Sequence, residues 1–321
     1  MATITRDRST SIETISKDLL ESFDQVFGLH PGFRPVHAKG LMCSGTFTPT
    51  AEARKLTRAP HVARPSTPVI VRLSDFAGVP SVADNDPMIA GPRGMAIRFS
   101  LAEHVHTDLI GHSHDGFPTR TGEEFLEFNR AIAASGPNAP KPTPLDRFLM
   151  SHPKAMEFIV APKPIPTSFA RESFFPVSAF EFTNQEGTSR YGRFRIRPEA
   201  GNEYLTAEQA AKKSPNFLFD EFSARLTSGP VKYRIFVQLA EDGDETSDAT
   251  IHWPENGPEI EFGTVGLTKR ENELEPEMRK VIFDPIPRVD GLAPSDDPLF
   301  DVRAALYLLS GRRRRAAAPP K

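Results

Sequence analysis

The feature of this sequence that most constrains its fold is a pair of strand-rich regions separated by a helical stretch. Runs rich in β-branched and aromatic residues, bounded by Gly, Pro, Asn and Asp, predict the strands. These runs are 68–73, 94–100, 104–110, 177–183, 191–197, 231–239 and 260–267. Residues 206–227 have the pattern of the intervening helical stretch, and strands do not alternate regularly with helices. This order argues against a doubly wound parallel sheet and predicts an α+β fold, an antiparallel β-barrel with surrounding helices.

Three further patterns predict helices around the barrel. Apolar residues recur at three-to-four spacing from Thr14 to Val26, before Gly28. Thr121 is suited to cap a second helix, which runs to Ala134. The last helix spans Asp297–Ser310, with a proline near its start and Gly311 after it. We expect one domain over 1–321, with an N-terminal helical arm at 1–30, a barrel with helical insertions at 31–270, and a terminal helix with a basic tail at 295–321.

Charge and cysteine content exclude several classes of protein. The formal net charge of −3 shows no global positive excess that would attract nucleic acid or an anionic membrane, and the basic run at 312–315 is local. No segment approaches the roughly 20 apolar residues of a membrane span, and the N-terminus lacks a signal-peptide core. The single cysteine, Cys43, excludes an intramolecular disulfide framework and suits a reducing compartment. We therefore expect a cytoplasmic protein without nucleic-acid or membrane partners.

Three separated segments contain the residues that could take part in catalysis or bind a cofactor. They are Arg34–Gly40 (RPVHAKG), the strand pair Pro68–Ser74 (PVIVRLS) and Arg93–Phe99 (RGMAIRF), and Arg303–Tyr307 (RAALY) on the last helix. Taken singly, a histidine in an apolar turn is typical of a core residue, and an Arg–Tyr pair four residues apart is typical of a helix surface.

In order and content, these segments resemble the motifs of the catalase family. The family has an R-x-x-H-A-x-G turn, a V-R-F-S strand, an R-G-x-A-x-x-F strand and an R-x-x-x-Y helix. Residues 108–111 (DLIG) are similar to the D-L-V-G that follows the second strand. The resemblance covers 33–128 and 297–314 closely and 175–267 loosely. It implies one haem-binding domain that contains haem b.

The resemblance also implies a role for each matching residue. Tyr307 would bind the haem iron as tyrosinate, the proximal ligand known for catalases, and Arg303 would favour its phenolate form. His37 would be the catalytic acid–base on the opposite face, with the Ser74 hydroxyl fixing its ring. The remaining haem-binding residues would be Arg34, Arg72 and Arg314 at the haem carboxylates, Phe117 and Phe125 beside the haem, and Val36 at the distal channel. Buried carboxylates need such cationic partners.

The sequence departs from the family directly after 108–111. Where the family has Asn-Asn-Thr-Pro, with the first asparagine over the haem, this chain has His112-Ser113-His114-Asp115. Either His112 replaces that amide, or the loop follows another course and Asp115 or a different group fills the space. The chain is also shorter than typical catalases and resembles the small catalase-related peroxidases. These features predict a haem peroxidase that reduces organic hydroperoxides and hydrogen peroxide with a small organic electron donor and has weak catalase activity. We expect a homodimer.

Four alternatives remain open at this stage. Two are enzymes, a small true catalase and a fatty-acid hydroperoxide isomerase of the allene oxide synthase type. A third is a non-enzymatic haem or lipid carrier. The fourth is a metal site made by His104, His106, His112 and His114, because alternate residues on a strand share a face and imidazole is a common metal ligand.

Overall fold

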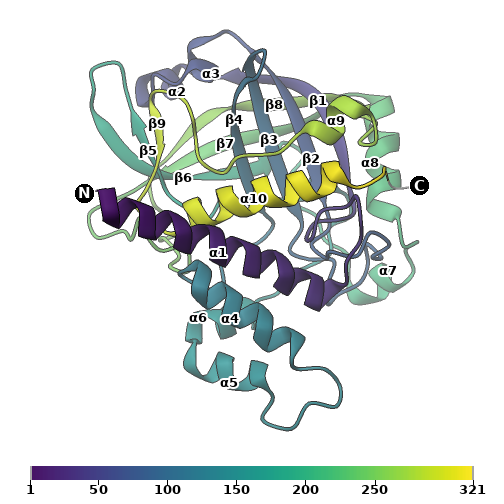
Figure 1. Cartoon of the computed structure of the whole chain (residues 1–321). Helices are drawn as coiled ribbons and strands as arrows, with labels where there is room; N and C mark the ends of the chain where they lie inside the picture. The colour runs from purple at the N-terminus through teal and green to yellow at the C-terminus, as the bar shows by residue number, and fades with distance from the viewer. Residues whose placement is uncertain (1, 320–321) are drawn as a thin grey trace.

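The centre of the molecule is one antiparallel sheet made of two meanders. The computed structural model describes residues 2–319. Its strands are β1 (Gly40–Pro49), β2 (Thr67–Ser74), β3 (Gly94–Ala102), β4 (Val105–His112), β5 (Phe180–Thr183), β6 (Ser189–Pro198), β7 (Val231–Leu239), β8 (Glu259–Glu271) and β9 (Leu292–Pro294). Their order is β4-β3-β2-β1-β8-β7-β6-β5-β9, so the pairing of β1 with β8 joins the two halves of the chain. The sheet curls into a half-barrel with helices around it (Figure 1), which confirms the predicted fold class.

A two-residue segment connects the edge strand β4 to β6, which lies in the other half of the curled sheet. Phe175 exchanges backbone hydrogen bonds with His112 at the end of β4, at 2.8 and 3.2 Å. Phe174 does the same with Ile196 on β6, at 2.8 and 2.9 Å. The last residue of β4 is therefore held by the segment before β5 as well as by its own sheet neighbour.

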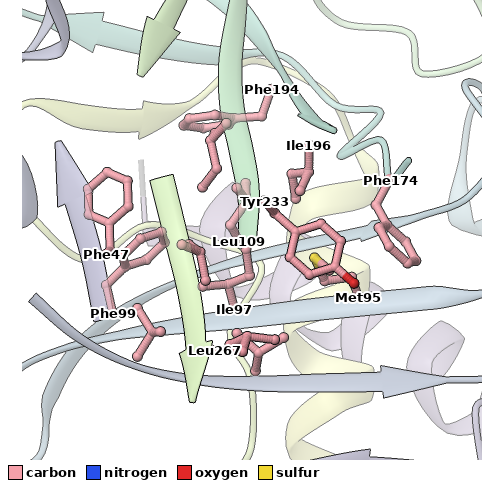
Figure 2. Packing of buried hydrophobic residues seen from close by; sticks show 14 of the residues in the cluster. Phe47, Met95, Ile97, Phe99, Leu109, Phe174, Phe194, Ile196, Tyr233 and Leu267 are labelled. Atoms are coloured by element: carbon pink, nitrogen blue, oxygen red, sulfur yellow. The ribbon is translucent and has the colours of Figure 1, made fainter. Parts of the chain in front are cut away.

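Aromatic and aliphatic side chains fill the concave side of the sheet (Figure 2). Phe47 packs edge-to-face on Phe99, with ring centroids 5.0 Å apart, and Phe194 packs in the same way on Phe262 at 5.3 Å. The buried Tyr233 hydroxyl donates a hydrogen bond to the backbone oxygen of Phe169 at 2.8 Å. The half-barrel is thus a packed core, and the abundant phenylalanines of the sequence form much of it.

Helices cover the outside of the sheet. They are α1 (Ala2–Phe27), α2 (Ala51–Leu56), α3 (Pro60–Ala63), α4 (Gly122–Ala133), α5 (Pro144–Ser151), α6 (Pro153–Val160), α7 (Ala207–Ala211), α8 (Phe217–Ser228), α9 (Pro276–Lys280) and α10 (Leu299–Ala316), with a 3-10 turn at Phe169–Arg171. The two terminal helices, α1 and α10, run side by side, and α4 packs against α1 (Figure 1). Leu19 and Phe23 of α1, Leu126 of α4, and Val302 and Leu306 of α10 form one apolar cluster.

Several predicted boundaries differ from the structure, and β1 and β9 were not predicted as strands. Two of the differences have identifiable reasons. The last helix does not end at Gly311 but continues to Ala316. A Cβ atom at Gly311 would lie 2.3 Å from Ile282 Cδ1, so the glycine permits close packing and does not cap the helix. The third predicted strand begins at Val105, because His104 has φ 61° and lies in the turn between β3 and β4. By contrast, the first helix ends before Gly28, whose φ is 82°.

In the part of the chain that the structure describes, none of the helices is long and apolar enough to cross a membrane.

Candidate active site

The turn before β1 holds His37 in a fixed orientation. His37 has φ 56°, in the left-handed region, and its backbone N–H donates a hydrogen bond to the oxygen of Phe76 at 2.6 Å. Its Nδ1 lies 3.0 Å from the backbone oxygen of Asp75 and 3.1 Å from Ser74 Oγ. A carbonyl oxygen can only accept a hydrogen bond, so Nδ1 carries the proton and Nε2 keeps its lone pair. The ring is oriented to act as a base through Nε2.

Burial and nearby cations keep this imidazole neutral. Burial, together with the positive charges of Arg72 and Arg34, lowers the pKa of His37 to about 4, against the raising effect of the Asp75 hydrogen bond. At neutral pH the ring is therefore unprotonated at Nε2 and ready to accept a proton.

Three residues paired across neighbouring strands lie beside the His37 ring. Gly94 on β3 pairs with Ser74 on β2 and with His112 on β4. Residues directly opposite each other in antiparallel strands present their side chains on the same face. A Cβ atom at Gly94 would lie 2.7 Å from Ser74 Oγ and 2.8 Å from His37 Nδ1, so the histidine ring can approach the sheet only because this residue is glycine.

His112 shares this face with Ser74 and His37. It stands at the position where the family motif has its first asparagine. Burial lowers its pKa to about 3, with additional contributions from the charges of His114, His37 and Arg303. The structure thus brings a second neutral imidazole to the region of His37.

Helix α10 packs near the His37 turn, since Val36 of that turn contacts an apolar cluster that includes Leu306. Arg303 and Tyr307 are one turn apart on α10 and are both half-buried. Leu306, next to Tyr307, is in the apolar cluster against which Val36 and Phe125 also pack. The Phe125 ring is 4.9 Å from that of Phe117. The predicted distal turn and the predicted iron-ligating helix therefore meet around a shared apolar cluster.

The three predicted carboxylate-binding arginines lie together at one end of the site. Arg72 is 4% exposed, and its Nε donates a hydrogen bond to Glu273 Oε1 at 2.7 Å. Arg34 Nη1 donates to the same oxygen. Arg314 is buried and donates to the backbone oxygens of Arg279 and Val281. Of the four arginines at 312–315, Arg314 is therefore the one that turns inward.

Sequence reasoning missed a buried charge cluster behind His37. Asp75 and Asp84 are both fully buried. Asp75 Oδ1 lies 3.5 Å from Arg93 Nε, and Asp84 accepts hydrogen bonds from Lys39 Nζ and from the backbone N–H of Leu218. Burial raises the pKa of Asp75 to about 8, and Arg93 offsets part of that effect. Asp75 directly follows β2 and Arg93 directly precedes β3, so their pairing holds together the strand ends that carry Ser74 and Gly94. In the sequence, the cluster could be suspected only from acidic residues within the catalase-like segments.

The predicted four-histidine metal site is not formed. The His104 side chain is 92% exposed in its turn and lies 3.6 Å from Glu103, while His106 contacts Asp108 at 3.0 Å. His112 and His114 pack instead around the Phe158 ring. Among the residues that the structure describes, no group of three or more His, Cys, Asp or Glu side chains could hold a metal ion. His106 and His112 stand near opposite ends of β4, and His104 lies in the turn before it, so a shared strand face does not bring these side chains together.

Known proteins resemble this chain over most of its length. A family model described as Catalase matches residues 30–318. The chain is 35% identical to a catalase-related peroxidase of Mycolicibacterium paratuberculosis, over 91% of this chain and 94% of that protein. It is 30% identical to a catalase-related peroxidase of Synechococcus elongatus, over 92% of this chain and 87% of that protein.

Solved catalases have the same fold. A fungal catalase matches with a TM-score of 0.77 at 21% identity, over 88% of this chain and 59% of that one. Catalase A from Saccharomyces cerevisiae matches with a TM-score of 0.75 at 20% identity, over 88% of this chain and 61% of that one. The chain thus spans less than two thirds of the length of these two catalases. From its sequence and its fold together, this chain belongs to the catalase family.

Proposed function

We propose that this protein is a haem peroxidase that binds haem b between the His37 turn and helix α10 and reduces peroxides with electrons from a small organic donor. The observation that supports this most strongly is the hydrogen-bonded imidazole of His37. Its Nδ1 proton is held by the backbone oxygen of Asp75, so that a neutral Nε2 is left free beside the site.

The residues present fit a haem. A haem brings two carboxylates, which need cationic partners when they are buried. Arg34 Nη2 and Arg314 Nε are buried N–H groups without a hydrogen-bond partner among the described residues. Arg34, Arg72 and Arg314 would hold the haem carboxylates, and Tyr307 would bind the iron. Arg303 lies one turn before Tyr307 on α10 and would be the cationic neighbour of that ligand.

The proposed reaction divides between the cofactor and the chain. The bound haem supplies the iron that exchanges electrons with the peroxide. His37 Nε2 takes the proton from one peroxide oxygen and delivers it to the other as the O–O bond breaks. Ser74 and the backbone oxygen of Asp75 hold the ring in place for both transfers. In balance, the hydroperoxide takes two electrons from the donor and two protons, and gives an alcohol and water.

The departure from the family at His112 supports peroxidase over catalase activity. Catalase turnover needs a second hydrogen peroxide held in the same distal space, and an imidazole here replaces the smaller amide of the family motif. The electron donor, the homodimer and the cytoplasmic location stay predictions.

One haem-loaded sample can test this proposal in two assays. We expect organic hydroperoxides to drive oxidation of phenolic or dye donors, and hydrogen peroxide to give weak oxygen release at an oxygen electrode. Vigorous oxygen release with negligible donor oxidation would contradict the proposal and indicate a small true catalase. Conversion of a fatty-acid hydroperoxide to an isomer without donor consumption would indicate the isomerase instead.

A further inference from the structure

Glu273 occupies the position that joins two of the predicted haem-binding arginines. It lies two residues after the end of β8, and its Oε1 accepts hydrogen bonds from both Arg34 Nη1 and Arg72 Nε. The motifs that identify the family do not include this residue. Burial raises the pKa of Glu273, but the charges and hydrogen bonds of Arg72 and Arg34 outweigh that effect and lower it to about 2. The carboxylate is therefore ionised throughout the neutral range.

One carboxylate does not balance the positive charge at this place. Arg314 lies nearby, because it lines the same pocket as Arg34 and Glu273. Three guanidinium groups are thus gathered near one carboxylate, and buried N–H groups of Arg34 and Arg314 have no hydrogen-bond partner among the described residues. The excess positive charge attracts further anions, but the N–H groups that Arg34 and Arg72 direct at Glu273 are already used.

An open pocket lies directly beside this cluster. It has a volume of about 310 Å³, and its lining includes Arg34, Glu273, Leu274, Arg279 and Arg314. The Glu273 side chain is 21% exposed, so it has a path to solvent on that side. The carboxylate can therefore move away from Arg34 and Arg72 without being transferred through the core.

We propose that Glu273 is an internal counter-ion that the haem carboxylates displace from Arg34 and Arg72, and that it thereby lowers the affinity of the chain for haem. The inference rests on the proposed function. A haem carboxylate that pairs with both Arg34 and Arg72 would use Arg34 Nη1 and Arg72 Nε, which are already bonded to Glu273. Binding must therefore break two charge-assisted hydrogen bonds before new ones form, and these are stronger than hydrogen bonds between neutral groups.

The test compares haem binding by the wild-type chain with that of Glu273→Gln and of a matched control, Glu271→Gln. Glu271 lines the same pocket but bonds to Ser44 and Lys269 and not to the arginines. Each haem-free protein is titrated with haem and with haem dimethyl ester, whose carboxylates carry no charge, and binding is followed at the Soret band. We expect Glu273→Gln to bind haem about 10- to 100-fold more tightly, while ester binding and the control stay unchanged.

A second readout separates this role from a purely structural one. In the haem-free state, Glu273→Gln leaves the arginines without their anion, so its Tm should fall below that of the wild type, and haem should restore it. If Glu273→Gln does not fold, Glu273→Asp, which shortens the side chain by one methylene, should show a smaller tightening. Equal or weaker haem binding by the folded variant would overturn the inference. Failure of the wild type to bind haem at all would overturn the proposed function with it.

Discussion

Among single residues, His37 carries most of the proposed chemistry, and its neighbours decide where its proton lies. The backbone oxygen of Asp75 holds the proton on Nδ1, while burial and Arg72 keep the ring neutral. The motif in the sequence indicated which histidine would act, but not how its tautomer is set. That depends on Ser74 and Asp75, which are far from His37 in sequence and close to it in the fold.

Replacing His37 tests its role as the acid–base. In His37→Ala the arginines and Tyr307 remain, so haem content should be close to that of the wild type. The rate at which peroxide changes the haem spectrum should fall by about 10²- to 10⁴-fold, the typical loss when a positioned acid–base is removed. Stopped-flow absorbance measures this rate, and a wild-type rate in a haem-loaded variant would show that another group transfers the proton.

The pH dependence of the same reaction tests the state of the ring. Because the pKa of His37 is lowered to about 4, Nε2 is free above that pH and protonated below it. The rate should therefore be constant from neutral pH down to about pH 5 and should fall by about tenfold per pH unit once the pH drops below 4. Circular dichroism at each pH confirms that the protein is folded. A midpoint near 6.5, the ordinary value for histidine, would contradict this environment.

At the scale of elements, the register of three strands positions the residues beside the His37 turn. The pairing of Ser74, Gly94 and His112 across β2, β3 and β4 puts their side-chain positions on one face, and Gly94 leaves the space that the His37 ring fills. The sequence predicted these strands from their β-branched residues. It could not show which residues stand opposite each other, because register depends on the pairing of whole strands.

Gly94→Ala should damage the site while leaving the sheet intact. The added methyl group would contact Ser74 Oγ and His37 Nδ1, so the ring must move and its hydrogen bond to Asp75 must lengthen. We expect at least a tenfold lower rate of reaction with peroxide, with little change in haem content. Gly266→Ala on β8 is the control, because a Cβ atom there would lie 4.0 Å from Thr46 O, an ordinary van der Waals distance. Equal rates in the two variants would show that the contact does not matter.

Across the whole molecule, local patterns predicted most strands and the helices α1, α4 and α10, but not β1 or β9, whose strand structure depends on pairing with distant segments. Motifs spread over the chain predicted the segments that meet at the site, because each keeps a recognisable local pattern. Glu273 could not be found in this way, since it meets Arg34 and Arg72 only through the fold. Gly311 was predicted to follow the end of the last helix, but it lies within the helix and permits close packing against Ile282.

The most direct test of the central claim is the ultraviolet–visible spectrum of the purified, haem-loaded protein, recorded before and after addition of peroxide. If His37 and Tyr307 lie on opposite sides of a bound haem, the wild type should show a Soret band that changes promptly with peroxide. Tyr307→Phe should lose haem or show a shifted band, because its ring has no oxygen to bind iron. The absence of a Soret band in the wild type, or an unchanged band at full occupancy in Tyr307→Phe, would contradict that arrangement.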